Sequence, residues 1–303
     1  MIGNGRFVEV GAGGAIGAGG GVGGVRLHTE AFGDAADPAV LLIHGAGHSA
    51  AAWDDAFVAR LVDGGRYVVR YDSRDAGRST ASPVGRPDYD LRTLVADAAA
   101  VIAALGIGPA HIVAMSQGAA VGQLLALDHP ESVATLTLAS STPGGPGHEA
   151  DDLPPMTEAI RALFAGESAE AQPGPDWSDR DAVIAYLVEA ERPFAAHSRP
   201  FDEEGVRAMA VRIVDRAGDI AAQVTNPFMI GAGEPWRARL ADVAVPTLVL
   251  HGTDDPLFPL DHGRALAAEI PGARFMEMPA TGHEVFPRTV WDTVVPAILA
   301  HTA

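Results

Sequence analysis

Ser116 is the first candidate for a reactive side chain in this sequence. It follows the short apolar run 111–115 and is flanked by small residues, with Ala114 two positions before it and Gly118 two after it. A run of this length is typical of a buried strand, and from residue 119 onward apolar positions recur at helical spacing. The stretch therefore predicts a strand, a sharp turn at the serine and a helix.

A serine at such a turn stands exposed above the edge of a sheet, at the N-terminus of a helix. This is the geometry that an acyl-transfer nucleophile needs, because the hydroxyl protrudes towards the substrate. The N–H of Gln117 then points to the place where negative charge develops on the attacked carbonyl. The alternative is an ordinary strand-to-helix turn in which Ser116 only caps the helix. The pattern alone does not decide between the two.

The composition excludes several other kinds of function. The net charge is −18 and all 21 basic residues are arginine. This argues against nucleic acids and membrane surfaces as partners, since both require basic patches. Cysteine is absent, which excludes disulfides, thiolate metal sites and cysteine nucleophiles. The first residues lack an export-signal pattern and no apolar run approaches the ~20 residues of a membrane span, so we expect a cytoplasmic protein. The sequence predicts no oligomeric state.

Short apolar strands alternate with helical patterns along most of the chain. We expect strands at 6–10, 25–32, 39–43, 67–71, 111–115, 133–139, 245–251 and 274–278, and helices at 53–62, 91–105 and at the C-terminus, ending near residue 299. This alternation predicts an α/β fold with a parallel sheet.

The region 144–239 differs from the rest of the chain. Proline and glycine separate helical patterns at 154–165, 179–197 and 202–217, and strand-like runs are missing. We therefore expect a core made of residues 1–143 and 240–303, interrupted by an all-helical insertion at 144–239.

A glycine-rich tract at 11–24 contains a match to a nucleotide-binding motif. Residues 19–24 fit the dinucleotide fingerprint G-x-G-x-x-G, which requires a helix directly after it. The residues that follow alternate like a strand instead. We therefore reject a dinucleotide site and expect a hairpin loop.

Several motifs of the chain resemble those of the α/β-hydrolase family. The serine turn resembles the nucleophile elbow G-x-S-x-G, with Ala114 in place of the first glycine, and residues 72–79 resemble the D-x-R-x-x-G-x-S turn. Residues 71–80, the elbow helix and the helix start at 261–263 look most like the aclacinomycin methylesterase-like carboxylic ester hydrolases. The resemblance covers nearly the whole chain. It implies a mostly parallel eight-stranded sheet flanked by helices, with a helical cap inserted before the last two core strands.

The resemblance also implies a catalytic triad. Its acid comes from the pattern G-x-x-D-x-x-x-P, which places Asp255 at the acidic position and leaves Asp254 as the neighbouring alternative. Its general base is His283, in the loop after the last strand. In this arrangement His283 takes the proton of Ser116, and the carboxylate orients the imidazole and stabilises its charged form. The charges of the 72–79 turn are expected to brace the loops beside the nucleophile.

The glycine-rich turn after strand 39–43 resembles the family's H-G-x-G oxyanion loop. The resemblance implies backbone donors at Ala46, with Gly47 as second choice, and at Gln117. His44 and His48 lie four residues apart, but on a glycine-containing loop without a carboxylate to complete a metal set, so we reject a zinc site. The chemistry calls for no cofactor or metal.

The motifs predict a serine hydrolase that cleaves a carboxylic ester, a small-molecule substrate, through an acyl-enzyme. The insertion is rich in large apolar residues, which favours a bulky apolar substrate and methylesterase-like or general carboxylesterase activity. Expected substrate contacts are Gly45, Gly47, Met115, Phe164, Trp177, Tyr186 and Trp236. Cofactor-free haloperoxidase, perhydrolase-like or lactonase activity would use the same triad, and a slowly turning over ligand-binding receptor is an alternative of another class.

Overall fold

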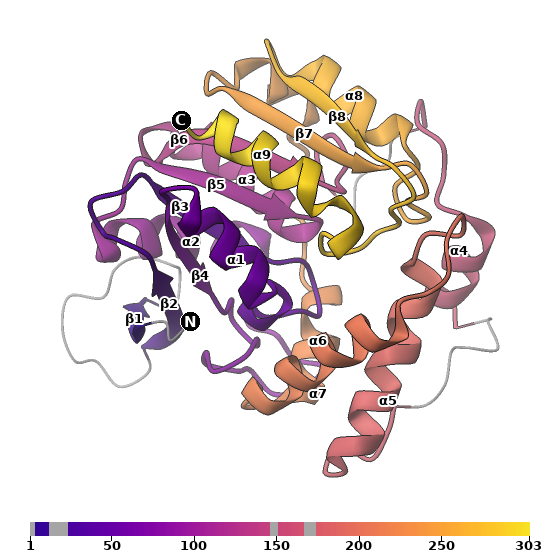
Figure 1. The fold of residues 1–303 in the computed structure, drawn as a ribbon. Helices are drawn as coiled ribbons and strands as arrows, with labels where there is room; N and C mark the ends of the chain where they lie inside the picture. Colours follow the sequence, from indigo (N-terminus) through magenta and orange to yellow (C-terminus); the bar gives the residue numbers. More distant parts are fainter. Residues whose placement is uncertain (1–3, 12–23, 146–150, 167–173) are drawn as a thin grey trace.

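An eight-stranded sheet lies between two layers of helices in the computed structural model, which describes residues 4–11, 24–145, 151–166 and 174–303 (Figure 1). The strands are β1 (Asn4–Val10), β2 (Val25–Phe32), β3 (Ala39–Ile43), β4 (Tyr67–Tyr71), β5 (Ala110–Met115), β6 (Val133–Ala139), β7 (Thr247–Gly252) and β8 (Arg274–Met278). Their order across the sheet is β1-β2-β4-β3-β5-β6-β7-β8. β2 pairs antiparallel with β1 and β4, and all other neighbours are parallel. The predicted mostly parallel sheet is thereby confirmed.

Helices cover both faces of the sheet, and each face has its own apolar core. The helices are α1 (Asp55–Asp63), α2 (Leu91–Leu105), α3 (Gln117–Asp128), α4 (Glu158–Phe164), α5 (Arg180–Glu191), α6 (Glu203–Arg216), α7 (Ile220–Thr225), α8 (Asp261–Glu269) and α9 (Trp291–His301). Side chains of α2, α3 and α8 belong to one core and side chains of α1 and α9 to the other.

The central strands feed both cores because successive side chains of a strand point to opposite faces. On β5, Ile112 and Ala114 pack in the core with α2 and α3, whereas Val113 and Met115 pack in the core with α1 and α9. Five of the six β5 residues are buried. A strand apolar on both faces is what a parallel sheet covered by two helical layers requires.

The glycine-rich tract is flanked by two paired strands. β1 and β2 are antiparallel, with Val10 opposite Val25, and the tract is followed by strand β2 rather than by a helix. This agrees with the rejection of a dinucleotide site. The expected hairpin loop itself, residues 12–23, lies outside the described residues.

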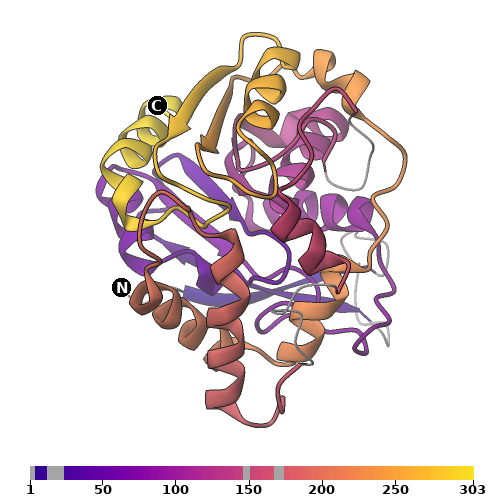
Figure 2. The ribbon, with the colours of Figure 1, turned by 90° about the vertical axis from the view of Figure 1, so that its right-hand side faces the viewer.

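Helices α4 to α7 all lie between β6 and β7 in the chain, and the described residues of this region contain no strand. Figures 1 and 2 show them beyond the ends of the parallel strands. The expected helix 179–197 is too long, because Pro193 follows α5 and the chain continues as the 3-10 turn η3 (Arg192–Phe194). Helix α7, with the 3-10 turn η4 (Asn226–Phe228) after it, was not predicted.

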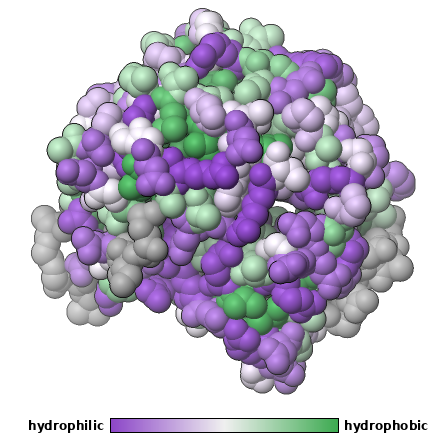
Figure 3. All heavy atoms as spheres, in the orientation of Figure 1, coloured by the Kyte–Doolittle hydropathy of each residue, from purple (hydrophilic) through white to green (hydrophobic). Residues whose placement is uncertain are grey.

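The molecular surface in the view of Figure 3 is mainly hydrophilic, with hydrophobic residues in separate patches. Among the described residues, no helix has both the length and the apolar character needed to cross a membrane.

Candidate active site

Ser116 occupies the sharp turn between β5 and α3. Its φ of 54° and ψ of −121° lie in a region that non-glycine residues rarely adopt. Its backbone N–H donates to the carbonyl of Ala139 on the neighbouring strand (3.0 Å), which anchors the turn. Although Ser116 stands at the N-cap position of α3, its side chain makes no capping hydrogen bond. The alternative of a helix-capping serine is therefore wrong.

Gly118 allows the start of α3 to pass close to the end of β3. A Cβ at this position would lie 2.6 Å from the Ile43 carbonyl oxygen and 2.5 Å from the His44 carbonyl oxygen. Both distances are too short for an alanine unless the backbone moves. The small residue after the serine is thus required by the approach of two core elements.

His283 lies between Ser116 and Asp255. Its Nε2 is 2.9 Å from the Ser116 Oγ, and its Nδ1 is 2.9 Å from the Asp255 Oδ2. The other Asp255 oxygen accepts from the backbone N–H groups of Leu257 (3.0 Å) and Phe258 (2.9 Å). A carboxylate can only accept, so Nδ1 carries the proton and Nε2 is left as an acceptor facing the serine.

Asp255 stays ionised although it is buried. Burial raises the pKa of the Asp255 carboxyl, but the nearby His283 and the hydrogen bonds to it outweigh burial and bring the pKa below its usual range. His251 lies behind it, with Nε2 2.7 Å from the Phe258 carbonyl oxygen and 3.7 Å from Asp255 Oδ2. The result is a fixed negative charge on the far side of the imidazole.

The carboxylate of Asp254, the alternative acid, is hydrogen-bonded to residues other than His283. One of its carboxylate oxygens accepts from the backbone N–H of Ser198 (3.0 Å), and the other accepts from the Thr253 hydroxyl (3.0 Å). Burial raises the pKa of Asp254, but these hydrogen bonds outweigh burial and keep the pKa below its usual value. The geometry therefore pairs His283 with Asp255.

The loop after β3 lies directly beside the serine. A Cβ on Gly45 would be 3.2 Å from the Ser116 Cβ, and Ala46 and Gln117 line the cavity next to Ser116. His44 holds the base of this loop, since its Nδ1 donates to the Gly45 carbonyl (2.9 Å) and its Nε2 accepts from the Ser73 N–H (3.2 Å). Burial lowers the pKa of His44 to about 4, so this imidazole is neutral at physiological pH.

The two histidines of the loop hold structural contacts rather than a common ligand. His48 Nε2 lies 2.9 Å from Glu191 Oε1 at the end of α5. Burial lowers the pKa of His48, but the negative charge of Glu191 and the hydrogen bond to it together outweigh burial and raise this pKa above its usual value. Among the residues that the structure describes, no group of three or more His, Cys, Asp or Glu side chains is placed to hold a metal ion.

A cavity of about 920 Å³ opens beside Ser116. Its described lining residues are Ala46, Leu91, Ser116, Gln117, Thr142, Gly145, Asp151, Leu153, Pro154, Pro155, Met156, Arg161, Phe164, Pro227, Phe228, Ile230, Gly231, Ala232, Leu257, Phe258 and His262. Most of them are apolar. One wall comes from the helical region and the other from core loops, so a substrate would lie between the two.

Most of the expected substrate contacts are not in the described lining of this cavity. Of the aromatic candidates, only Phe164 lines this cavity. Trp177 instead packs edge to face on Tyr186, with ring centroids 5.7 Å apart, and Trp236 is buried with its Nε1 donating to Gln123 (3.1 Å). These three side chains are part of the packing of the helical region and its junction with the core.

The other three expected contacts, Gly45, Gly47 and Met115, are also absent from the described lining of the cavity. Met115 is buried in the core behind the serine. Gly45 adjoins the serine, and a Cβ on Gly47 would lie 3.3 Å from the Phe228 ring. Phe228 and Ile230, which line the cavity, were missed, because the packing of the segment after α7 against this loop brings them to the site.

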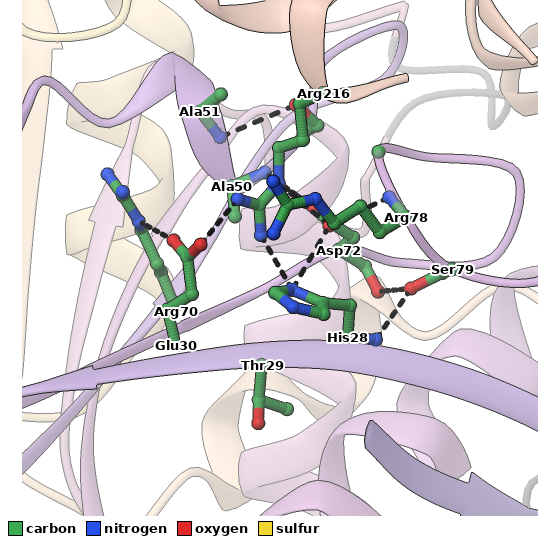
Figure 4. A network of polar contacts seen from close by, with 12 residues as sticks. His28, Thr29, Glu30, Ala50, Ala51, Arg70, Asp72, Arg78, Ser79 and Arg216 are labelled. Atoms are coloured by element: carbon green, nitrogen blue, oxygen red, sulfur yellow. Dashed lines mark hydrogen bonds and ion pairs between the residues drawn. The ribbon is translucent and has the colours of Figure 1, made fainter. Parts of the chain in front are cut away.

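The turn after β4 is joined by polar contacts to β2, to the loop after β3 and to α6 (Figure 4). The fully buried Asp72 carboxylate accepts from the Ala50 N–H (2.9 Å) and from Nε of Arg216, which lies 2.9 Å and 2.8 Å from its two oxygens. Arg216, the last residue of α6, also contacts Glu30 (2.6 Å) and His28 (2.9 Å). Burial and the Arg216 charge lower the pKa of His28. The turn thus holds α6 on the core, and none of its residues is in the described lining of the cavity.

Comparison with known proteins identifies the class to which this fold and site belong. The sequence pattern of the alpha/beta hydrolase fold family matches residues 38–288. The chain belongs to the α/β-hydrolase fold family.

Particular relatives are similar over nearly the whole chain. The sequence is 34% identical to rhodomycin D methylesterase DnrP of Streptomyces peucetius over 92% of this chain and 95% of the relative. The crystal structure of esterase RhEst1 from Rhodococcus sp. ECU1013 superposes with a TM-score of 0.71 at 22% identity, covering 98% of this chain and 99% of that one. The enol-lactonase from Burkholderia xenovorans LB400 gives a TM-score of 0.68 at 22% identity over 91% and 96% of the two chains.

Proposed function

We propose that this protein is a serine hydrolase that cleaves a carboxylic ester through an acyl-enzyme. The observation that carries the proposal is the pair of 2.9 Å contacts that His283 makes, one to the Ser116 hydroxyl and one to the Asp255 carboxylate. A hydroxyl, an imidazole and a buried carboxylate in this order are the parts needed to activate an oxygen nucleophile.

Acylation would begin when Ser116 Oγ attacks the ester carbonyl and passes its proton to His283 Nε2. The imidazolium that forms is stabilised by Asp255, which remains ionised. The backbone N–H groups of Ala46 and Gln117 would donate to the oxyanion of the tetrahedral intermediate. Collapse of that intermediate breaks the bond to the alcohol, which leaves with the proton from His283.

Deacylation repeats these steps with water as the nucleophile. His283 accepts a proton from water as the hydroxide equivalent adds to the acyl carbonyl, and then returns the proton to Ser116 as the carboxylic acid departs. The sum is one ester and one water converted to one acid and one alcohol. All groups required are protein side chains or backbone, and the described site needs no added cofactor for these steps.

The substrate would be a bulky, largely apolar ester. A cavity of about 920 Å³ lies at the upper end of the range of small-molecule sites, and its apolar lining favours an apolar acyl or alcohol group. The similarity to a protein named as a methylesterase supports a methyl ester, whose small alcohol leaves the cavity for the acyl part. We infer that residues 144–239 act as a cap that shapes this cavity.

Turnover of p-nitrophenyl esters of rising acyl length, alongside a bulky aromatic methyl ester, tests the proposal. We expect sustained hydrolysis that is lost in Ser116→Ala, and a preference for the bulky methyl ester. Hydrolysis that survives in Ser116→Ala would overturn the assignment. Peroxide-dependent turnover in acetate would instead indicate a perhydrolase, and a single stoichiometric burst would indicate a receptor.

A further inference from the structure

The loop that carries His283 is held from outside the sheet by the helical insertion. The backbone N–H of His283 donates to the carbonyl oxygen of Phe194 (2.8 Å). Phe194 ends the 3-10 turn η3, and its ring centroid lies 6.2 Å from that of His283. One residue of the insertion therefore contacts both the backbone and the side chain of the general base.

Gly282 makes this close approach sterically feasible. A Cβ at position 282 would lie 2.2 Å from the Phe194 carbonyl oxygen, 2.6 Å from the Ala195 carbonyl carbon and 2.6 Å from the Ala196 nitrogen. All three atoms belong to backbone, which cannot turn aside as a side chain would. The segment 194–196 can pack on the histidine loop only because glycine precedes the histidine.

An ion pair between Arg199 and Glu284 is a second contact between the insertion and the histidine loop. The Arg199 guanidinium is paired with the Glu284 carboxylate, next to His283 in the chain, and the two side chains are only 14% and 15% exposed. Arg199 Nε also donates to the Ala280 carbonyl (2.9 Å). The second Glu284 oxygen accepts from the N–H groups of Gly282 (2.8 Å) and Ala196 (3.2 Å). Such a partly buried, multiply hydrogen-bonded pair resists solvent screening better than an exposed one.

A third contact joins the segment to the loop of the triad acid. Asp254 accepts from the backbone N–H of Ser198 (3.0 Å) and directly precedes Asp255. The segment 194–199 is therefore hydrogen-bonded to both loops that complete the triad beyond Ser116. Neither Arg199 nor Glu284 is among the residues that line the cavity.

We propose that residues 194–199, together with Glu284, form a positioning clasp that sets His283 at hydrogen-bonding distance from Ser116. This rests on the function proposed above, in which His283 is the general base. Because the clasp lies behind the histidine loop and outside the cavity lining, loosening it lowers the rate of the chemical steps and leaves substrate binding nearly unchanged. Arg199, Glu284 and Gly282 are accordingly positioning residues.

The variants Arg199→Met and Arg199→Lys test the clasp, with Arg212→Met as the matched control. Arg212, on α6, also joins the insertion to the core, through a hydrogen bond from its Nε to the Ala51 carbonyl (3.2 Å). No hydrogen bond or ion pair joins it to residues 280–284. We expect Arg199→Met to lower kcat about 10- to 100-fold with KM changed less than about twofold. Arg199→Lys retains the charge next to Glu284 and should recover a large part of kcat. Arg212→Met should keep kcat near the wild-type value.

The pH profile separates positioning from a simple loss of folded protein. Without Arg199 the Glu284 carboxylate lacks its counter-charge beside His283, which favours the protonated imidazole. We expect the acidic limb of kcat/KM to move to higher pH in Arg199→Met and to stay in place in Arg212→Met. A merely structural role would lower the amplitude of the profile without moving it, and would contradict the proposal.

Amide hydrogen exchange of the peptide covering residues 280–284 provides a readout that needs no substrate. Exchange should accelerate in Arg199→Met but not in Arg212→Met. Equal kcat losses in the two variants, or unchanged exchange at 280–284, would overturn the clasp. A wild-type enzyme that hydrolyses no ester would overturn the proposed function instead, while selective acceleration of exchange in Arg199→Met would still support the docking contact.

Discussion

Ser116 and His283 face each other across 2.9 Å, but different parts of the chain hold them. Ser116 is fixed by the sheet, through its backbone hydrogen bond to Ala139 and through the contact of Gly118 with the end of β3. His283 lies in a loop after β8, and its own backbone N–H donates to the carbonyl of Phe194 in the helical insertion. The hydrogen bonds of the Ser116 backbone therefore lie within the core, whereas the backbone of His283 is held by the insertion.

Substitutions in the two regions should therefore have different effects on stability and activity. A substitution in the insertion can alter the position of the base without disturbing the nucleophile or the sheet. A substitution behind Ser116 disturbs stability and activity together, because the same backbone contacts serve both. The insertion thus makes two kinds of contact, since it lines the cavity through Phe164 and Phe228 and is hydrogen-bonded to His283 through Phe194.

The largest loss of activity is expected for a substitution of Asp255, the carboxylate paired with His283. Asp255→Asn leaves an amide whose N–H₂ group can face His283 and select the wrong tautomer, so kcat should fall about 10⁴-fold. Asp254→Asn is the matched control, because an amide oxygen can still accept from Ser198; it should cost less than about tenfold. Steady-state kinetics with one ester would measure both. Similar losses in the two variants would contradict the assignment of Asp255.

Two glycine substitutions compare the core contact beside Ser116 with the insertion contact beside His283. Gly118→Ala forces a Cβ to within 2.6 Å of a β3 carbonyl oxygen and should lower the free energy of unfolding by about 1–3 kcal/mol, with activity lost as well. Gly282→Ala displaces the insertion segment rather than the sheet. It should lower kcat strongly with a smaller change in unfolding free energy.

Denaturant unfolding and kinetics on both glycine variants would check this contrast. Gly218→Ala serves as control, because among the described residues its Cβ would meet only the Gly77 carbonyl oxygen, at 3.5 Å, which is an ordinary contact. An equal loss of stability in Gly118→Ala and Gly282→Ala would refute the division between core and insertion.

Two histidines of the loop after β3 should respond to pH with opposite signs. Burial lowers the pKa of His44 to about 4, so its unfolded form binds more protons between pH 6.5 and 4 and stability falls as the pH drops through this window. The difference between pH 7 and pH 5 is about 2 kcal/mol, and His44→Gln should remove it. Unfolding free energies measured at both pH values would show this; an unchanged slope in His44→Gln would exclude His44 as its source.

The contact between His48 and the insertion has the reverse dependence. Its pKa is raised by Glu191, so the stabilisation is present below the usual histidine pKa and is lost as the pH rises through the raised value. Glu191→Gln should therefore destabilise the protein more at pH 6 than at pH 8. The effect on the core sheet should be small, since the contact joins the loop to α5.

The smallest expected effect concerns the cavity wall. Phe228 is 58% exposed and lines the cavity, so Phe228→Ala should raise KM for a bulky ester about fivefold, equivalent to about 1 kcal/mol of apolar contact. Trp177→Ala should leave KM unchanged, because Trp177 packs on Tyr186 away from this cavity. Michaelis constants for the two variants would test the wall, and a larger effect of Trp177→Ala would contradict it.

The structure around Ser116 in the core could be predicted from the sequence far better than the contacts of the insertion. The β5 strand, the turn at Ser116 and the helix after it follow from local patterns, an apolar run, small residues and helical spacing. The pairing of His283 with Asp255 was also within reach, because both residues lie in short motifs after core strands. These features depend on residues close together in the chain.

The contacts of the insertion could not be predicted in the same way. The Phe194 carbonyl meets the His283 N–H across 89 residues, and the glycine at 282 that permits this contact is one of 35 in the chain. Large aromatic residues in the insertion gave no sign of which face they would present. Trp177 and Tyr186 pack on each other. Phe228 reaches the cavity because α7, a helix of six residues, is hydrogen-bonded to the loop after β3 through Gln223 and Gly47.

Labelling with a fluorophosphonate, followed by intact mass and peptide mapping, tests the central claim most directly. The reagent needs both an activated serine and a correctly placed base, and it does not depend on the identity of the natural ester. We expect one adduct per chain on Ser116, none in Ser116→Ala, and slower labelling in Arg199→Met than in Arg212→Met. An adduct on another residue, or equal labelling rates in the two arginine variants, would contradict a nucleophile fixed by the core and a base fixed by the insertion.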